Sequence, residues 1–345
     1  MRAAIFRGVG QPLSIETVPD PTPAAFEVVI KVARCGICGT DLHMTADEAA
    51  SYPIGAALGH EYAGEIVGLG REVTGIKMGE HVTAQPMAGC GNCDPCVSGE
   101  PYWCDNWRSM MGGFGEYTLA DARSVAKLPA SLSLSDAALV EPLAAAFNGV
   151  QLARLTKGAR VLVLGAGGLG LGCIFWLRRM GCGKIVAAAR SDRNGPLALS
   201  MGADALITTV RSDFEAELRV LLGGLPDFVF ECVGAPGVLE LAARCARRRG
   251  VVVGLGMCLK HDPWTPAVAM GKQIRLQFSA AYSMADFHRC IDVLAAGAPE
   301  LRRLVSRTVS LEELPQTFEE LRHSSHYCKV MVDPSNRSPM ATAAS

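Results

Sequence analysis

The stretch Val161–Gly170, VLVLGAGGLG, decides the fold class of this chain. Its apolar residues predict a buried strand, its glycines predict a tight turn, and the apolar run that follows predicts a helix over Leu169–Met180. Between a strand and a helix, Gly-x-Gly-x-x-Gly is typical of a dinucleotide site, because the backbone can approach the pyrophosphate and the helix N-terminus faces its charge. A strand–helix turn without a ligand is the alternative. The residues assigned to this site are Gly165, Gly167, Gly168, Leu169 and Gly170.

Short apolar strands alternate with helices after this stretch, which predicts a doubly wound parallel sheet. The predicted strands are Arg160–Leu164, Lys184–Ala188, Ala205–Thr208, Phe228–Cys232, Val251–Leu255 and Ile274–Phe278. The residues before it form short strand-like runs broken by Pro and Gly, which indicate an irregular, mostly β domain. We therefore expect an α/β protein with a β-rich domain over 1–148, a dinucleotide-binding domain over 149–297, a return to the first domain over 298–333 and a disordered tail over 334–345.

Length and composition agree with this division. A chain of 345 residues suggests two domains, and 49% hydrophobic residues allow a large core. The formal net charge of -1 gives no reason to expect nucleic acid or a membrane surface as a partner. The most apolar run, 161–177, is shorter than the ~20 residues of a membrane span and contains many glycines. No apolar signal precedes the 13 cysteines, which favours intracellular thiols and metal ligands over disulfides, and a cytoplasmic protein.

A cluster of cysteines in a lobe over about 88–106 predicts a structural metal site. Its spacing is C-x2-C-x2-C-x7-C, set among Gly, Asn, Asp and Pro. Four thiolates on one tight loop suit tetrahedral zinc, and a loop without an apolar core needs the metal for its order. The spacing differs from that of the ferredoxin iron–sulfur clusters, and four unrelated loop cysteines are the other alternative. The expected ligands are Cys90, Cys93, Cys96 and Cys104.

A second group of residues predicts a catalytic metal site. The segment Cys35–His43, CGICGTDLH, is followed by Gly59-His60-Glu61 and later by Val140-Glu141-Pro142. Each motif is weak by itself, because a lone histidine is more often a core residue than a ligand. Together they offer a thiolate, an imidazole and one or two carboxylates, which suits a zinc site that keeps one position open for catalysis.

With both groups in view, the chain resembles the zinc-containing medium-chain dehydrogenase/reductase (alcohol dehydrogenase) superfamily, and its sorbitol or polyol dehydrogenase-like branch in particular. The resemblance extends from Met1 to about Asp333. It implies a GroES-like catalytic domain, a Rossmann dinucleotide-binding domain and two zinc ions per chain, one catalytic and one structural. It also implies a homodimer or homotetramer that acts on small-molecule alcohols or ketones.

The resemblance assigns roles to individual residues of the second group. Cys38 and His60 match the catalytic zinc ligands, whereas either Glu61 or Glu141 completes the resting set. Thr40 and His43 match the proton relay. Cys35 is interpreted as a buried thiol rather than a ligand. The residues expected to be catalytic are therefore Cys38, Thr40, His43, His60, Glu61 and Glu141.

The end of the second predicted strand bears on the choice of cofactor. NAD enzymes place an acidic residue there for the ribose hydroxyls, about 20 residues after the glycines, but this chain has Ala189. Arg190, Ser191 and Arg193 offer charge-assisted hydrogen bonds to a 2′-phosphate. We expect NADP(H) to be favoured over NAD(H). A solvated arginine pair, or Asp192 acting as a displaced acid, is the alternative.

The resemblance also places residues around the nicotinamide and the substrate. The residues expected beside the nicotinamide are Val233, Gly234, Gly254, Leu255 and Gly256. The loops near Met44–Tyr52 and Met110–Phe114 are expected to line the substrate pocket. The implied activity is hydride transfer between a secondary alcohol, either a polyol or a small or cyclic alcohol, and NADP(H). A zinc-independent quinone or enoyl reductase and a non-catalytic, crystallin-like NADPH-binding protein are the rival interpretations. Which alcohol is used is not readable from these residues.

Overall fold

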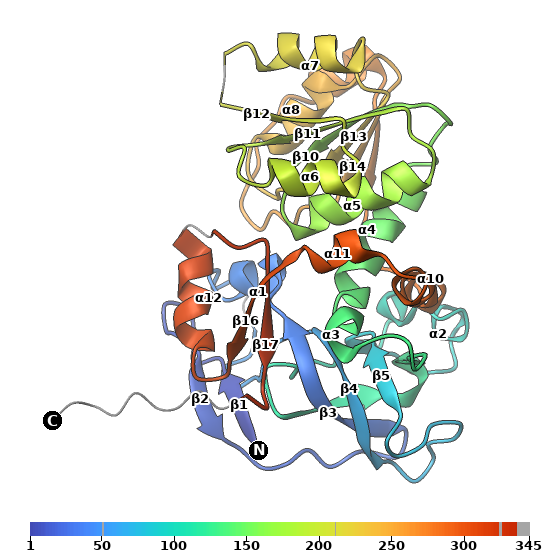
Figure 1. Ribbon diagram of the computed structural model, residues 1–345, viewed down its shortest axis with the longest axis vertical. Helices are drawn as coiled ribbons and strands as arrows, with labels where there is room; N and C mark the ends of the chain where they lie inside the picture. Colours follow the sequence, from blue (N-terminus) through green and yellow to red (C-terminus); the bar gives the residue numbers. More distant parts are fainter. Residues whose placement is uncertain (50–51, 211, 324–325, 337–345) are drawn as a thin grey trace, which may run out of the picture. The chain divides into compact units, whose positions relative to one another are not determined.

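The computed structural model describes residues 1–49, 52–210, 212–323 and 326–336 (Figure 1). The chain divides into two compact units. Unit 1 comprises Met1–Glu141, Ser283–Ala298 and Val305–Ser345, and unit 2 comprises Pro142–Tyr282 and Pro299–Leu304. Most of the tail expected to be disordered, residues 337–345, lies outside the described residues. No helix among the described residues combines the length and the apolar character needed to cross a bilayer.

Unit 2 is built on the parallel sheet that the sequence predicts. Its spatial order is β12 (Ala205–Thr208), β11 (Lys184–Ala189), β10 (Arg160–Leu164), β13 (Phe228–Glu231), β14 (Val251–Gly254) and β15 (Arg275–Phe278). Every neighbouring pair in this order is parallel. The strand order reverses between β10 and β13, which is where doubly wound sheets bind ligands.

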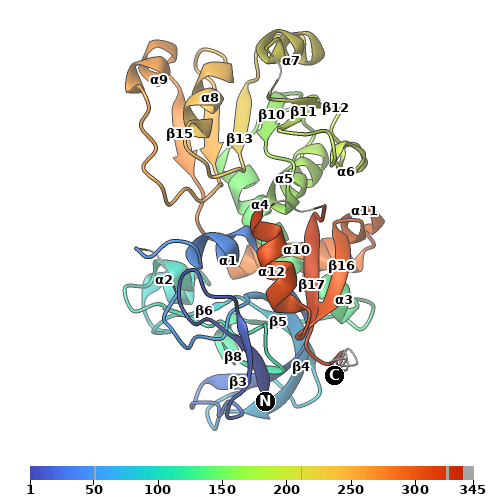
Figure 2. The ribbon, with the colours of Figure 1, turned by 90° about the vertical axis from the view of Figure 1, so that its left-hand side faces the viewer.

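Helices cover both faces of this sheet because its strands are apolar on both sides (Figure 2). The helices of unit 2 are α4 (Val140–Leu152, whose first two residues belong to unit 1), α5 (Gly168–Arg179), α6 (Gly195–Met201), α7 (Phe214–Leu222), α8 (Val238–Cys245), α9 (Pro266–Lys272) and α11 (Pro299–Arg302). The predicted helix Leu169–Met180 corresponds to α5 within one residue at each end. The sequence analysis gave no bounds for α6, α7 and α9, which have short or interrupted apolar patterns.

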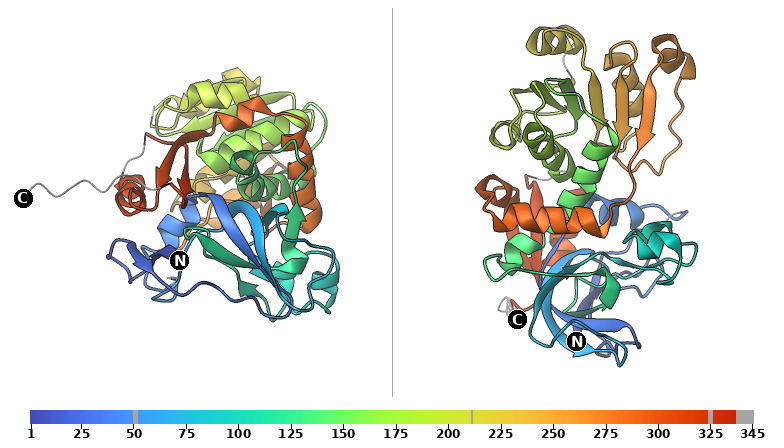
Figure 3. Two further views of the ribbon diagram at one scale, coloured as in Figure 1. Left: turned by 60° about the horizontal axis from the view of Figure 1, so that its bottom comes forward. Right: turned by 90° about the vertical axis from the view of Figure 1, so that its right-hand side faces the viewer.

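Unit 1 contains a strongly bent, mostly antiparallel sheet, whose strands from the N-terminal part of the chain are blue and cyan in Figure 3 and whose two C-terminal strands are red. Its order is β16 (Val305–Ser310), β17 (Lys329–Asp333), β3 (Glu27–Gly36), β4 (Glu61–Leu69), β5 (His81–Ala84) and β9 (Val125–Lys127), and β8 (Tyr117–Asp121) also pairs with β3. Smaller pairs join β1 (Arg2–Ile5) to β2 (Ser14–Thr17) and β6 (Met87–Ala88) to β7 (Arg108–Ser109). The remaining helices of this unit are α1 (Gly39–Met44), α2 (Asp94–Val97), η1 (Pro101–Trp103), η2 (Ala122–Ser124), α3 (Leu134–Ala137), α10 (Met284–Ala295) and α12 (Leu314–His323).

The division into units differs from the expected boundary near residue 298. The segment Ser283–Ala298 belongs to unit 1, although the sequence analysis assigns it to the dinucleotide-binding domain. Its helix α10, orange in the right-hand view of Figure 3, contacts α3 and β9. The apolar face of α10, with Phe287 and Ile291, is buried. An amphipathic helix pattern does not reveal which core its apolar face joins, so the sequence could not place this boundary.

Candidate metal and dinucleotide sites

The ligands expected at the catalytic metal lie where strands of the unit 1 sheet begin and end. Cys38 follows β3 as the N-cap residue of α1, and His60 directly precedes Glu61, the first residue of β4. Glu61 pairs across the sheet with Gly36, the last residue of β3. Ligand atoms of Cys38, His60 and Glu61 all lie within 4.8 Å of one another. The sheet register therefore brings Cys38 together with the adjacent His60 and Glu61, which belong to a separate motif in the sequence.

The carboxylate of Asp41 lies next to both Cys38 and His60. It is fully buried at the third position of α1, and its Oδ2 accepts the backbone N–H of Cys38 at 3.1 Å. Its Oδ1 lies 3.2 Å from His60 Nδ1, without the alignment of a hydrogen bond, and has no hydrogen-bond donor within the described residues. Burial disfavours a charged His60, but the Asp41 carboxylate and the Cys38 sulfur outweigh it and raise its pKa. A carboxylate beside Nδ1 favours a hydrogen on that nitrogen and leaves Nε2 available as a ligand.

These residues fit a zinc ion. A thiolate, an imidazole and a carboxylate in mutual reach are the donors of catalytic zinc sites. The carboxylate behind the histidine is the support that ligating histidines usually have. Asp41 lies within the Cys35–His43 motif, but its sequence position alone does not reveal this role.

Lys329 is a second residue of this site that the sequence analysis missed. It is the first residue of β17, and its Nζ lies 2.6 Å from both carboxylate oxygens of Glu61 and 3.1 Å from the carbonyl of Ile37. Burial opposes its charge, but Glu61 and Cys38 raise the pKa of the Lys329 ammonium above its ordinary value. The only sequence signal was a lysine that opens an otherwise apolar strand.

The other residues expected to be catalytic belong to unit 1, like Cys38, His60 and Glu61. Thr40 and His43 lie three residues apart on α1, where Thr40 is half-buried and His43 is exposed. Glu141 is buried in the first turn of α4. Within the part of the chain that the structure describes, Glu141 is not among the residues whose ligand atoms lie within 4.8 Å of one another at this site. Its negative charge nevertheless contributes to the raised pKa of Lys329.

The expected structural site is assembled as one cluster. Ligand atoms of Cys90, Cys93, Cys96 and Cys104 lie within 4.8 Å of one another, and all 13 cysteines of the chain are free thiols. The backbone N–H of Asn92 is the largest influence that lowers the pKa of Cys90 to about 6, whereas the neighbouring sulfurs raise the pKa of Cys93, so Cys90 is the thiol of this pair that loses its proton first. This arrangement fits a closed tetrahedral zinc site.

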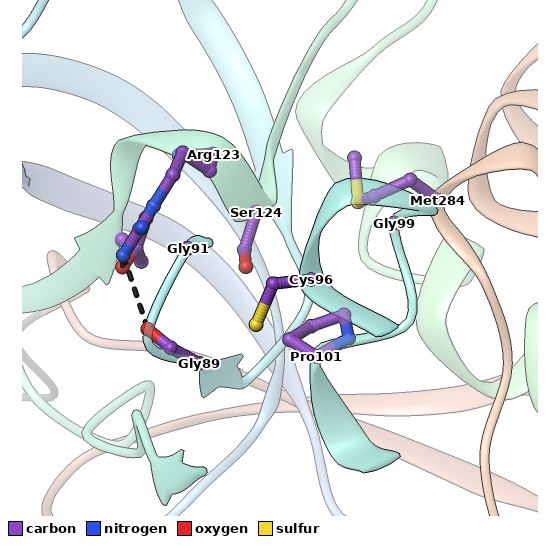
Figure 4. Close-up of a pocket in the computed structure, with 9 residues that line it drawn as sticks. Gly89, Gly91, Cys96, Gly99, Pro101, Arg123, Ser124 and Met284 are labelled. Carbon is purple, nitrogen blue, oxygen red and sulfur yellow. Dashed lines mark hydrogen bonds and ion pairs between the residues drawn. The ribbon is translucent and has the colours of Figure 1, made fainter. Parts of the chain in front are cut away.

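Arg123 adds a cation to this lobe. Figure 4 shows its side chain next to Gly89 and Gly91, with Nη2 3.1 Å from the carbonyl of Gly89, in the small pocket that Cys96 and Ser124 also line. This pocket belongs to the cysteine lobe and contains none of the residues of the candidate catalytic site.

The glycine-rich turn has the geometry that its sequence predicts. Gly165 adopts a φ of 97° after β10, and Gly167 is the N-cap residue of α5. A Cβ at Gly170 would lie 1.9 Å from the carbonyl oxygen of Gly165, so only glycine fits there. A Cβ at Gly167 would meet nothing within 4 Å, and Gly168 and Leu169 begin the helix. The helix therefore starts close to its strand, with open space at its N-terminus for an anionic group.

The residues expected to choose the cofactor follow β11, which ends at Ala189. Arg190, Ser191 and Arg193 are exposed in the loop before α6, and neither arginine forms an ion pair within the described residues. Asn194, which the sequence analysis missed, donates from Nδ2 to the carbonyl of Ala166 at 2.7 Å. It therefore ties this loop to the glycine-rich turn.

Glu231 organises the loops expected beside the nicotinamide. Its buried carboxylate accepts the backbone N–H groups of Val233 and Gly234 at 2.6 and 2.9 Å. The backbone carbonyl of Glu231 accepts the backbone N–H groups of Leu255 and Gly256, which follow Gly254 at the end of β14. One residue at the end of β13 thus joins both loops, a function that its position in the sequence does not reveal.

The two loops expected to line the substrate pocket differ in character. Residues 50 and 51 of the first lie outside the described residues, but Tyr52 packs against the apolar core of unit 1. Burial and the Asp41 carboxylate raise the pKa of its phenol. In the second, Phe114 is fully buried in the core of unit 1, and its ring occupies the space where Gly59 lacks a side chain. Phe114 therefore holds the strand end before His60 rather than lining a pocket.

Two family models match this chain. The alcohol dehydrogenase GroES-like domain covers residues 24–130, and the zinc-binding dehydrogenase domain covers residues 168–296. The chain belongs to the zinc-containing medium-chain dehydrogenase/reductase superfamily. The resemblance and the two-domain fold class expected from the sequence are thus confirmed, and the chain is an alcohol dehydrogenase-family oxidoreductase that uses a nicotinamide cofactor.

Relatives in this medium-chain superfamily include polyol dehydrogenases. Sorbitol dehydrogenase from Bacillus subtilis strain 168 is 29% identical, with 97% of each chain covered. The structure of a zinc-binding dehydrogenase from Sinorhizobium meliloti 1021, bound to NADP, is 30% identical with a TM-score of 0.86 over 96% of this chain and 99% of that one. A short chain alcohol dehydrogenase from E. coli CFT073, complexed with NADH, is 27% identical with the same TM-score and coverage. The chain therefore falls in the sorbitol and polyol branch, and the solved structures similar to it include one bound to NADP and one bound to NADH.

Proposed function

We propose that this chain is a zinc-dependent dehydrogenase that transfers a hydride between a secondary alcohol, such as a polyol or a small cyclic alcohol, or its ketone and NADP(H). The observation that carries the proposal is the convergence of Cys38, His60 and Glu61 within 4.8 Å. Rival members of the superfamily without zinc lack such a set.

We assign metal binding, proton transfer and cofactor binding to different residues of the chain. Cys38, His60 and one of the two glutamates, Glu61 or Glu141, would hold the zinc, which when bound supplies a Lewis acid for the alcohol or carbonyl oxygen. Thr40 and His43 lie three residues apart on α1, and we assign them the proton relay, in which half-buried Thr40 takes up the alcohol proton and exposed His43 releases it to solvent, with the nicotinamide ribose hydroxyl between them. The turn from Gly165 to Gly170 would bind the pyrophosphate of the cofactor.

Substitution at Cys38 tests the metal site. We expect Cys38→Ser to lose most turnover and one metal per chain while it retains dinucleotide binding. Cys258→Ser, at a half-buried thiol remote in sequence from both cysteine groups, serves as the control and should keep both metals. Full turnover of the Cys38→Ser enzyme with one metal lost would refute the proposal.

The cofactor preference has its own test. Ala189 leaves no carboxylate to repel a 2′-phosphate, and Arg190 and Arg193 offer exposed positive charge. The double substitution Ala189→Asp and Arg190→Leu should reverse the ratio of kcat/KM values for NADP⁺ and NAD⁺. Unchanged NADP⁺ selectivity in the double variant would contradict the proposal.

A panel of alcohols and ketones, assayed with each cofactor alongside metal analysis, addresses the substrate. Turnover of secondary alcohols with two zinc ions per chain is the expected result. Turnover of quinones or enoyl compounds without metal, or cofactor binding without turnover, would support one of the rival interpretations instead. Light scattering would test the expected dimer or tetramer.

A further inference from the structure

Lys329 makes an ion pair that is unusually enclosed. The side chain of Glu61 is fully buried and that of Lys329 is 8% exposed. The ammonium donates to both oxygens of Glu61 at 2.6 Å and to the carbonyl of Ile37 at 3.1 Å, so its three donors are all used. The two residues are 268 positions apart and meet only because β17 and β4 flank β3 on opposite sides.

The Glu61 carboxylate has little freedom in this position. A Cβ on Gly36 would lie 2.0 Å from Glu61 Oε2, so the carboxylate occupies space that β3 leaves open by having glycine there. On its other side, an oxygen of Glu61 lies within 4.8 Å of the ligand atoms of Cys38 and His60. The carboxylate is therefore placed between an ammonium and a candidate metal position.

Burial alone does not explain this pair. A buried ion pair is seldom more stable than apolar residues of the same volume, because both charges must leave water. The three residues that follow Lys329 in β17, Val330, Met331 and Val332, are buried and apolar. A lysine at this position thus suggests a role toward the cluster rather than toward stability.

We propose that Lys329 is a positioning residue that competes with the metal for Glu61, and thereby keeps Glu61 a weak, exchangeable ligand. The proposal rests on the metal site of the proposed function. Hydrogen bonds from an ammonium withdraw electron density from both carboxylate oxygens and lower their donor strength. If Glu61 bound permanently beside Cys38, His60 and Glu141, four protein ligands would close the site, whereas catalysis needs an open position.

A double-mutant cycle of metal affinity tests this competition. The proteins are the wild type, Lys329→Met, Glu61→Gln and the double variant, each titrated with zinc or cobalt against a chromophoric chelator. Lys329→Met should bind metal at least about tenfold more tightly than the wild type, and the same substitution should give no gain in the Glu61→Gln background. The visible spectrum of the cobalt protein should change in Lys329→Met, since a freed carboxylate joins the metal.

The matched control is Lys329→Arg, which keeps the charge and the donors and should stay near wild-type affinity and spectrum. Metal affinity that is unchanged or weaker in Lys329→Met, or that rises equally in the Glu61→Gln background, overturns the competition. If Lys329→Met is unfolded without metal, recovery on adding metal supports the proposal, because the metal then replaces the ammonium as the partner of Glu61. The proposal is overturned if Lys329→Met does not refold on adding metal while the double variant is folded and binds metal with wild-type affinity.

Failure of the proposed function gives a different result. If Cys38→Ser binds as much metal as the wild type, there is no metal site at Cys38 and both proposals fall. If Cys38→Ser loses one metal but Lys329→Met leaves affinity and spectrum unchanged, only the competition falls.

Discussion

Asp41 shows how much of the metal site depends on a single residue that is not a ligand. Its carboxylate accepts the N–H of Cys38 and faces His60 Nδ1, so it restrains both the thiol and the imidazole. Residues that orient metal ligands in this way typically contribute about 10- to 100-fold to metal affinity or activity.

We therefore expect Asp41→Asn to lower zinc affinity at the catalytic site by about 10- to 100-fold, because the amide keeps the shape but not the charge. The measurement is competition with a chelator. Glu48→Gln, an exposed change in the segment after α1, should leave the affinity unaltered. Wild-type affinity in Asp41→Asn would show that the carboxylate does not restrain the ligands.

At the scale of elements, Asp227 joins segments that lie far apart in the sequence. Just before β13, it accepts hydrogen bonds from the backbone and side chain of Arg160, the first residue of β10, and from Arg247 before β14. Burial acts to raise the pKa of Asp227, but Arg160 and Arg247 outweigh it and lower that pKa to about 2, from an ordinary 3.8. The starts of three neighbouring strands are thus fixed by one carboxylate.

This lowered pKa predicts an acid-dependent stability. A carboxyl with a depressed folded-state pKa stabilises the fold above its unfolded pKa, and loses that contribution as the pH falls through the folded value. Asp227→Asn should lower the free energy of unfolding by about 1–3 kcal/mol near pH 5. The difference from wild type should shrink between about pH 4 and pH 2.

Urea unfolding at several pH values measures this effect. Asp192→Asn is a suitable control, because Asp192 is exposed and its side chain makes no ion pair within the described residues. A difference between wild type and Asp227→Asn that stays constant from pH 5 to pH 2 would contradict the assignment.

At the scale of the whole molecule, the two candidate metal sites lie in unit 1 and the glycine-rich turn lies in unit 2. We expect the order of the cysteine lobe to depend on metal, because a tight loop of Gly, Asn, Asp and Pro has little apolar core of its own, whereas the sheet of unit 2 has a buried apolar core. Metal ions should therefore stabilise parts of unit 1, and the dinucleotide should stabilise unit 2.

Hydrogen exchange can separate these responses. Removal of metal with a chelator should speed exchange over residues 88–106 and around α1, and leave the strands of unit 2 protected. NADP⁺ at 100 times its Kd should stabilise the folded state by about 2.7 kcal/mol and slow exchange around β10 and α5. Unchanged exchange over 88–106 after metal removal would rule out a structural metal in that lobe.

Much of this protein could be predicted from local sequence. The glycine-rich turn, the strands of unit 2 and the cysteine lobe depend on residues close together in the chain, where spacing and side-chain type determine the geometry. The candidate ligands Cys38, His60 and Glu61 were also recognisable, since Cys38 sits in one short motif and the adjacent His60 and Glu61 sit in another.

Only the tertiary structure identified the contacts between segments that are far apart in the sequence. Lys329 reaches Glu61 across β3, Asp227 meets Arg160 through sheet register, and α10 joins the core of unit 1, each over a long separation in sequence. Sequence patterns report the period and polarity of a segment, but not which strands become neighbours. The zinc-type donor set was therefore determined by the sequence itself, whereas the charge placed behind Glu61 was decided by how the sheet is assembled.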